Sequence, residues 1–88
     1  MKIYVGNLSP QTMEDDLRKT FEIFGEVNEV NIATDKSGGQ SRRFGFIEMR
    51  SKFYAHAAIS ELNGLELDGR RLVVYRLSSL HENRISVS

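Results

Sequence analysis

Hydrophobic and polar residues alternate along four stretches of the chain, and this period of two predicts half-buried β-strands. The stretches are residues 2–6, 27–33, 42–49 and 71–75. In the first, Ile3 and Val5 are predicted to face inward, and Tyr4 falls between them on the outward face. The other three stretches follow the same rule, so each predicted strand has one core face and one exposed face.

A spacing of three and four residues between apolar side chains predicts a first helix. Its stripe holds Leu17, Phe21 and Phe24. Thr12 is its predicted N-cap, in a capping box followed by acidic residues. Gly25 is its predicted end.

A second helix is predicted to begin at Ser51 and to end at Asn63-Gly64. Its stripe is Ala55, Ala58, Ile59 and Leu62. Glycine and polar residues predict a hairpin-type loop at 35–41 and a turn-rich connection at 65–69.

The resulting order is strand–helix–strand–strand–helix–strand, the ferredoxin-like split βαββαβ arrangement of an α+β fold. Right-handed crossovers place both helices on one face of a four-stranded antiparallel sheet and leave the other face open. The first and third strands are then central neighbours, and the fourth lies beside the first. We expect one domain over residues 1–77 and a mobile tail over 78–88.

The open face is predicted to carry aromatic side chains, although an exposed sheet face is normally polar. The outward aromatic positions are Tyr4, Phe44, Phe46 and Tyr75. Such a cluster is either covered by another element, such as the tail or a second subunit, or stacks against unpaired bases. Basic residues beside the cluster favour base stacking. They are Lys2, Arg42, Arg70, Arg71 and Arg76.

Charge is balanced over the 88 residues, with 12 basic and 12 acidic side chains. A protein that holds nucleic acid by bulk electrostatics has a large excess of basic residues and usually a pI above about 9. The balanced charge of this chain argues against that mode of binding. The balance hides a division, because residues 1–35 carry three basic and seven acidic side chains, and residues 36–88 carry nine and five. Basic charge therefore gathers in the second part, which contains three of the four aromatic positions.

The sequence shows no arrangement of residues that is typical of a catalytic site. Without cysteine, disulfides, thiolate zinc sites and cysteine nucleophiles are excluded. His56 and His81 have no acid or serine at a fixed spacing, and Gly38-Gly39 is not followed by the lysine of a phosphate-binding loop. We expect no enzyme, no cofactor, no metal and no small-molecule substrate. No apolar run approaches about 18 residues, and no signal peptide is recognisable, so we expect no membrane partner and a cytoplasmic location.

Around the aromatic positions the chain resembles the RNA recognition motif family, over residues 2–76. The segment Ile3–Leu8 resembles the family's six-residue RNP motif, and Arg42–Met49 resembles its eight-residue RNP motif. As a short chain, it is most similar to the single-motif RNA-binding proteins of bacteria. The resemblance implies a non-catalytic protein that binds single-stranded RNA and acts after transcription.

The resemblance also implies a role for each outward residue. Tyr4 and Phe46 would each stack under a base, and Phe44 would lie between the two sugars. Arg42 would pair with the phosphate between those sugars. Flanking nucleotides would be contacted by Lys2, Asn31, Glu48, Tyr75 and the backbone from Arg76 onward.

One position departs from the family pattern, because Arg43 stands where the octamer usually has glycine. Two alternatives stay open, a phosphate contact or a side chain lying on the helix side of the sheet. The alternative function is a protein-interaction module that uses the sheet or the helix face. Single-stranded DNA also stays open as a ligand, and we expect a monomer.

Overall fold

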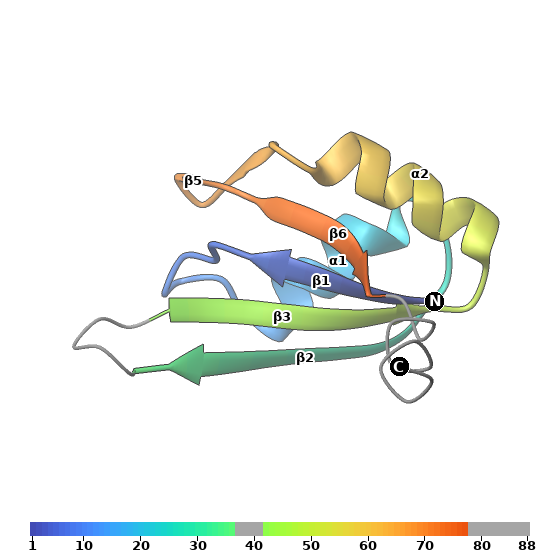
Figure 1. Cartoon of the computed structure of the whole chain (residues 1–88). Coiled ribbons are helices and arrows are strands. Elements are labelled where there is room, and N and C mark those ends of the chain that lie inside the picture. The colour runs from blue at the N-terminus through green and yellow to red at the C-terminus, as the bar shows by residue number, and fades with distance from the viewer. Residues whose placement is uncertain (37–41, 78–88) are drawn as a thin grey trace, which may run out of the picture.

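The computed structural model describes residues 1–36 and 42–77, which form two helices and a four-stranded sheet (Figure 1). The elements are β1 (Lys2–Gly6), α1 (Glu14–Glu22), β2 (Val27–Asp35), β3 (Arg42–Met49), α2 (Lys52–Leu62), β4 (Glu66–Leu67), β5 (Arg70–Arg71) and β6 (Val73–Leu77). The sheet has the order β2-β3-β1-β6, and neighbouring strands are antiparallel. The predicted ferredoxin-like α+β fold is confirmed, including the central position of β1 and β3.

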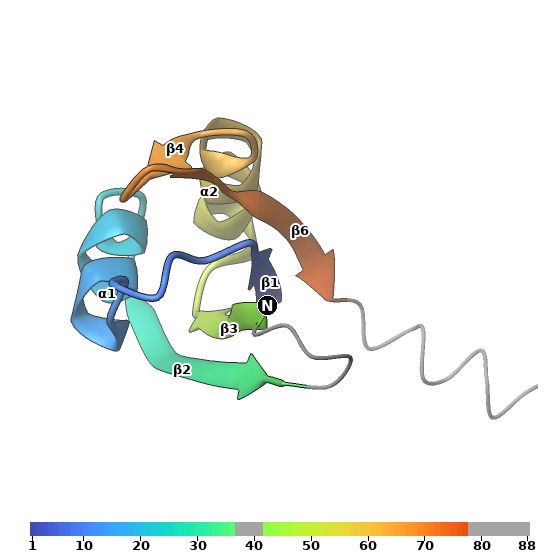
Figure 2. The same ribbon diagram turned by 90° about the vertical axis from the view of Figure 1, so that its left-hand side faces the viewer.

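The core lies between the sheet and the two helices, which cover the same face (Figure 2). The inward apolar residues of the strands are fully or almost fully buried, as the alternation predicts, except Ile32 of β2, which is partly buried. The apolar stripes of both helices pack against them. Leu17 and Phe21 of α1 have no exposed surface. The opposite face of the sheet is not covered by either helix (Figures 1 and 2).

The start of α1 differs from the prediction by one residue. Met13, not Thr12, is the N-cap, and its N–H donates to the Asp16 carboxylate at 2.8 Å. Thr12 is fully buried, and its hydroxyl instead donates to the Asp68 carboxylate at 2.7 Å. The threonine therefore joins the loop before α1 to a segment 56 residues later, an interaction that local spacing does not predict.

The end of α1 also differs, because the helix stops at Glu22 and Gly25 lies in the following turn. A side chain at Gly25 would place its Cβ 2.8 Å from the Cβ of Tyr54 on α2. This glycine is thus required by the close approach of α2 to the turn.

The connection predicted at 65–69 contains a small hairpin, in which β4 pairs with β5. Asp68 and Gly69 form its turn with φ values of 52° and 82°, the left-handed geometry that an Asp-Gly pair favours. The last strand consequently begins at Val73, two residues later than predicted, and runs to Leu77. The second strand also extends beyond the predicted Ala33, since Asp35 pairs with Arg42.

Side chains from the helix layer also bond to both outer strands of the sheet. The Ile32 N–H of β2 donates to the Glu14 carboxylate at 3.2 Å. The Val74 N–H of β6 donates to the Asn63 side-chain oxygen at 2.9 Å. These bonds fasten α1 and the end of α2 to opposite edges of the sheet.

Within residues 1–36 and 42–77, no helix has the length and apolar character needed to cross a membrane. Most of the predicted loop at 35–41 and the whole predicted tail at 78–88 lie outside the described residues.

Candidate nucleic-acid interface

Outward side chains of the four strands line up in rows across the open face. Cross-strand pairing places Asn31, Phe46, Tyr4 and Tyr75 in the central row. On one side lies a row of Glu29, Glu48, Lys2 and Leu77. On the other side lie Ala33 and Phe44, then Gly6 and Val73. The face therefore has aromatic residues at its centre, mostly charged residues on one side and uncharged residues on the other.

Four rings form the centre, which we call the aromatic surface and define as Tyr4, Phe44, Phe46 and Tyr75. The Tyr4 and Tyr75 ring centroids are 4.7 Å apart with an interplanar angle of 26°. Phe44 and Phe46 meet edge to face at 5.6 Å, and each lies 6.0 Å from Tyr4. Tyr75 is 48% exposed, and the other three rings are half-buried against one another. The rings thus have faces or edges open to solvent in positions fixed by their neighbours.

Two glycines in the motif segments make this arrangement possible, and they serve opposite faces. A Cβ at Gly6 would lie 2.8 Å from Cε2 of Tyr4, so the absence of a side chain leaves room for the tyrosine ring. Gly45 faces the helices, where a Cβ would lie 2.9 Å from Cδ1 of Leu17. The position of the Tyr4 ring therefore depends on Gly6, and the packing of α1 on the sheet depends on Gly45.

A basic pocket of about 490 Å³ lies beside Tyr4 and Phe44. It is lined by Tyr4, Asn7, Asp35, Arg42, Arg43, Phe44 and Arg70. Arg42 is exposed there at the start of β3. Guanidinium groups bind phosphate oxygens well because they present several N–H donors in one plane. This end of the sheet can therefore hold a phosphate next to the stacked rings.

Asn7 positions a second arginine at this pocket. Its backbone has φ of 62°, a left-handed conformation that asparagine tolerates. The Arg70 guanidinium donates to the Asn7 side-chain oxygen at 2.9 Å, and the Asn7 amide donates to the Arg71 carbonyl at 2.7 Å. Sequence reasoning placed Arg70 only in a general basic group and gave Asn7 no role. The available signals for Asn7 were its place in the segment Ile3–Leu8 and its position directly after a strand.

Arg43 lines the basic pocket, but its guanidinium is directed to the helix side of the sheet, which favours the second of the two alternatives left by the sequence. It is half-buried, and its guanidinium donates to the Thr12 carbonyl oxygen. The side chain thus ties β3 to the loop before α1. Arg42, one residue earlier, is left as the exposed arginine of the pair.

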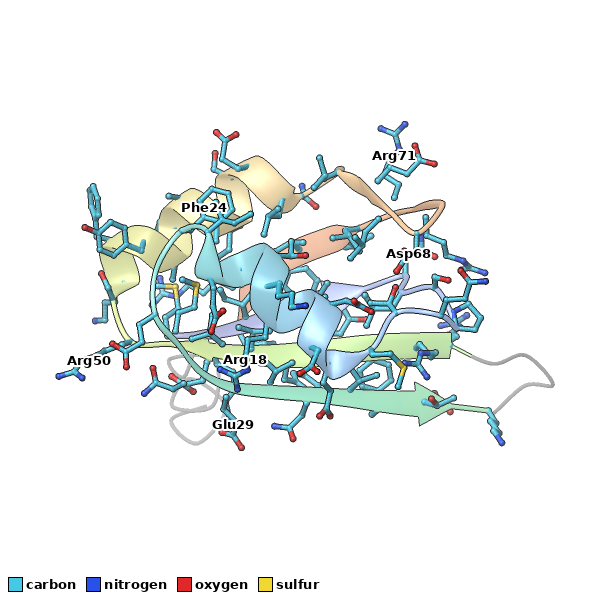
Figure 3. All side chains as sticks on the ribbon, turned by 180° about the vertical axis from the view of Figure 1, so that it is seen from behind. Arg18, Phe24, Glu29, Arg50, Asp68 and Arg71 are labelled. Atoms are coloured by element: carbon cyan, nitrogen blue, oxygen red, sulfur yellow. The ribbon has the colours of Figure 1, made fainter. Side chains whose placement is uncertain are left out.

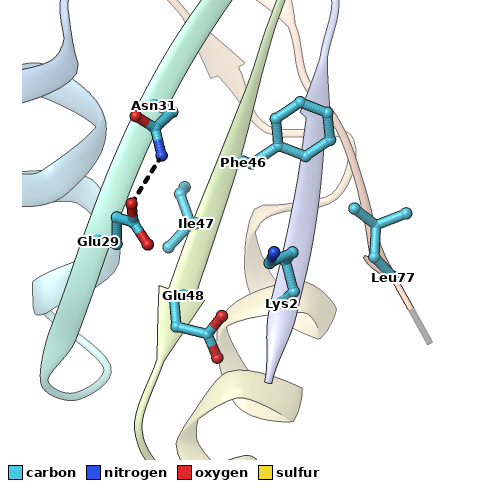
Figure 4. Close-up of a pocket in the computed structure, with 7 residues that line it drawn as sticks. All are labelled: Lys2, Glu29, Asn31, Phe46, Ile47, Glu48 and Leu77. Carbon is cyan, nitrogen blue, oxygen red and sulfur yellow. Dashed lines mark hydrogen bonds between the residues drawn. The ribbon is translucent and has the colours of Figure 1, made fainter. Parts of the chain in front are cut away.

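A second pocket, of about 270 Å³, lies at the other end of the open face (Figure 4). It is lined by Lys2, Glu29, Asn31, Phe46, Ile47, Glu48 and Leu77. The Asn31 amide donates to the Glu29 carboxylate at 3.3 Å, and the Glu48 carboxylate accepts from the Met1 ammonium at 3.0 Å. Lys2, Asn31 and Glu48 were predicted here. Glu29 and Leu77 were not, although alternation along β2 and β6 could have identified both.

One predicted site residue lies on the other face. Arg76 pairs with Ile3, an inward residue, so its side chain is directed to the helix side of β6. The side chain is out of phase with Tyr75 and therefore does not join the basic residues expected beside the rings. The role expected of the Arg76 backbone stays a prediction.

The opposite side of the molecule carries charged and exposed residues on the helices (Figure 3). His56 is exposed on α2, and His81 lies outside the described residues. Over residues 1–36 and 42–77, no three histidine, aspartate or glutamate side chains gather closely enough to hold a metal ion.

Residues 3–73 match the family model of the RNA recognition motif. Two similar proteins of a Nostoc species are named as RNA-binding proteins, RbpE and RbpD. RbpE is 49% identical over 74 residues, which cover 84% of this chain and 75% of that protein. RbpD is 43% identical over 84 residues, which cover 96% and 89%. A crystal structure of RNA binding protein PG1 superimposes with a TM-score of 0.78 at 42% identity, covering 88% of this chain and 93% of that one.

Proposed function

The chain belongs to the RNA recognition motif family, and from this premise we propose that it binds short single-stranded RNA by stacking bases on the aromatic surface. RNA as the ligand is supported by the family and by the names of the relatives. The observation that carries the stacking mode is the group of four rings on the uncovered face, with Tyr4 and Phe46 paired across the central strands. Stacking suits unpaired bases, because every base presents a π-face once it is out of a helix.

Each residue of the surface has a proposed role. Tyr4 and Phe46 stack under neighbouring bases, and Phe44 lies against the sugars, where RNA differs from DNA by its 2′-hydroxyl. Arg42 binds the phosphate between those sugars, supported by its exposed position at the basic pocket. Arg70, held by Asn7, is proposed as a second phosphate contact.

We propose a non-catalytic, monomeric protein with a role after transcription. A protein-interaction module is less well supported, because the family and the names of the relatives both point to RNA. With two or three stacked bases and few phosphate contacts, the dissociation constant should be about 1–100 μM. A cytoplasmic location stays a prediction from the sequence.

An amide chemical-shift titration with a pool of short random RNA oligonucleotides tests the proposal. We expect shifts confined to the four strands β1, β2, β3 and β6, with little change on α1 and α2. Shifts centred on the helices would contradict the proposed surface. A folded protein whose spectrum does not change at millimolar RNA would contradict RNA binding.

Binding should depend only weakly on salt, because stacking provides most of the affinity. Each neutralised phosphate of a single strand contributes about −0.7 to the slope of log K against log salt, so two to four contacts predict a slope of about −1.5 to −3. Arg42→Ala should make this slope shallower by about 0.7. The measurement is fluorescence anisotropy of a labelled oligonucleotide at several salt concentrations.

Lys19→Ala provides the control, since it removes the same charge from the exposed side of α1. It should leave the slope unchanged. A wild-type slope near −6, or equal effects of the two substitutions, would indicate binding by general charge and would contradict stacking.

A further inference from the structure

Resting on the proposed function, we infer that the pocket next to Phe46 selects guanine, with Glu29 reading the base edge. The pocket adjoins the aromatic surface directly, because Glu48 follows Phe46 by two residues on β3 and so projects from the same face. A base stacked on Phe46 therefore extends its polar edge toward Glu29, Glu48 and Lys2. This inference concerns which base is bound, and the stacking proposal concerns whether bases are bound.

The charges of the pocket are unsuited to a phosphate. Glu29 and Glu48 are direct partners across β2 and β3, so two like charges lie opposite each other on the open face (Figure 4). Such a pair is destabilising unless other groups compensate. Lys2, the partner of Glu48 on β1, and the Met1 ammonium, 3.0 Å from the Glu48 carboxylate, supply positive charge on the Glu48 side of the pocket. The Glu29 carboxylate is left to bind N–H donors, which a base can supply and a phosphate cannot.

Of the two carboxylates, Glu29 is the more available to a ligand. The Glu48 side chain is 36% exposed, and its carboxylate already accepts from the Met1 ammonium. Glu29 is exposed at the edge of the sheet, and its bond from Asn31 is long, at 3.3 Å. A hydrogen bond of that length is weak and is readily exchanged for a shorter one.

Guanine has the base edge that matches these groups. Its Watson–Crick edge presents two adjacent donors, N1–H and the 2-amino group, which fit the two oxygens of one carboxylate. The neighbouring O6 accepts a hydrogen bond from an ammonium such as that of Lys2. Adenine and cytosine each present one amino donor beside an acceptor nitrogen, and uracil presents one N–H between two carbonyls. Bidentate pairing with Glu29 is thus possible only for guanine.

Pentamers of uridine with a single central substitution test this inference. The four central residues compared are guanosine, adenosine, cytidine and inosine, with all-uridine as the reference. Because a good bidentate pair discriminates by about 1–3 kcal/mol, the guanosine pentamer should bind about 5- to 150-fold more tightly than the reference. Inosine lacks the 2-amino group, so it should lose most of this preference.

Glu29→Gln is the decisive variant, because glutamine keeps the size of the side chain but replaces one of the two acceptor oxygens with an NH2 donor, so it cannot pair with two adjacent N–H donors. It should reduce the guanosine preference to about 3-fold or less, and it should raise the melting temperature slightly by removing a like-charge pair. Glu61→Gln, on the exposed side of α2, removes the same charge and should change neither property.

The possible failures can be told apart. If all pentamers bind equally and Phe46→Ala weakens their binding, guanine selection is overturned and the stacking proposal stands. A guanosine preference that survives in Glu29→Gln would overturn the assignment to Glu29. If no pentamer binds to the folded protein, the proposed function itself is wrong.

Discussion

Replacing Phe46 with alanine is expected to weaken RNA binding about 5- to 150-fold while leaving the fold intact. The loss corresponds to one base stack, worth about 1–3 kcal/mol. Phe46 lies in the central row of the open face, between Asn31 and Tyr4. Its ring is half-buried by other rings of the aromatic surface and is not part of the core between sheet and helices. Anisotropy titration measures the binding, and circular dichroism checks the fold.

Phe53→Ala is the matched control for this experiment. Phe53 is an exposed phenylalanine on α2, with 76% of its surface accessible, so the same atoms are removed from the other side of the molecule. Its affinity for RNA should equal that of the wild type. Equal losses in the two variants, or no loss with Phe46→Ala, would show that the aromatic surface does not bind the bases.

Replacing Phe21 with alanine is expected to lower the free energy of unfolding by about 3–5 kcal/mol. Phe21 is fully buried on the inner face of α1 and is among the largest side chains of the core. Removing the ring deletes apolar contacts and leaves a cavity between the sheet and the helices, which these can close only in part. Small domains are stable by about 5–15 kcal/mol, so the loss is a large share of the total.

The same control serves here, because Phe53→Ala deletes an exposed ring and should cost less than about 0.5 kcal/mol. Urea denaturation of both variants, followed by circular dichroism, measures the difference. A loss below about 1 kcal/mol for Phe21→Ala would mean that α1 is not packed on the sheet as described.

Much of the fold could be predicted because its elements follow simple periods. The bounds of β3 were predicted correctly at Arg42 and Met49, since eight residues alternate without interruption. Helix α2 was also predicted well, because Ser51 caps it by accepting the Tyr54 N–H and Gly64 follows it with φ of 88°. In these elements the local pattern and the final packing agree.

The errors in the fold arose where distant contacts compete with local rules. Thr12 looks like a helix cap, yet its hydroxyl is used by Asp68 in the β4–β5 turn. That turn carried a recognisable Asp-Gly signal, and overlooking it displaced the predicted start of β6. No spacing within the loop before α1 could have indicated a partner 56 residues away.

For the candidate site, alternation predicted which residues share the open face but not what surrounds them. The four rings were predicted, and the structure brings them together. The support of Arg70 by Asn7 could not be predicted, because it depends on a left-handed backbone at the end of β1. Arg76 was misplaced because it was chosen by charge and not by its phase along β6.

The bonds between the helix layer and the outer strands have a consequence for self-association. Free N–H groups on an outer strand are a template on which a strand from a neighbouring molecule can add, a common route to aggregation. Here Glu14 already engages an N–H of β2, and Asn63 engages one of β6. An incoming strand would have to displace a carboxylate at one edge or an amide at the other. Concentrating the protein should therefore not extend its sheet from molecule to molecule.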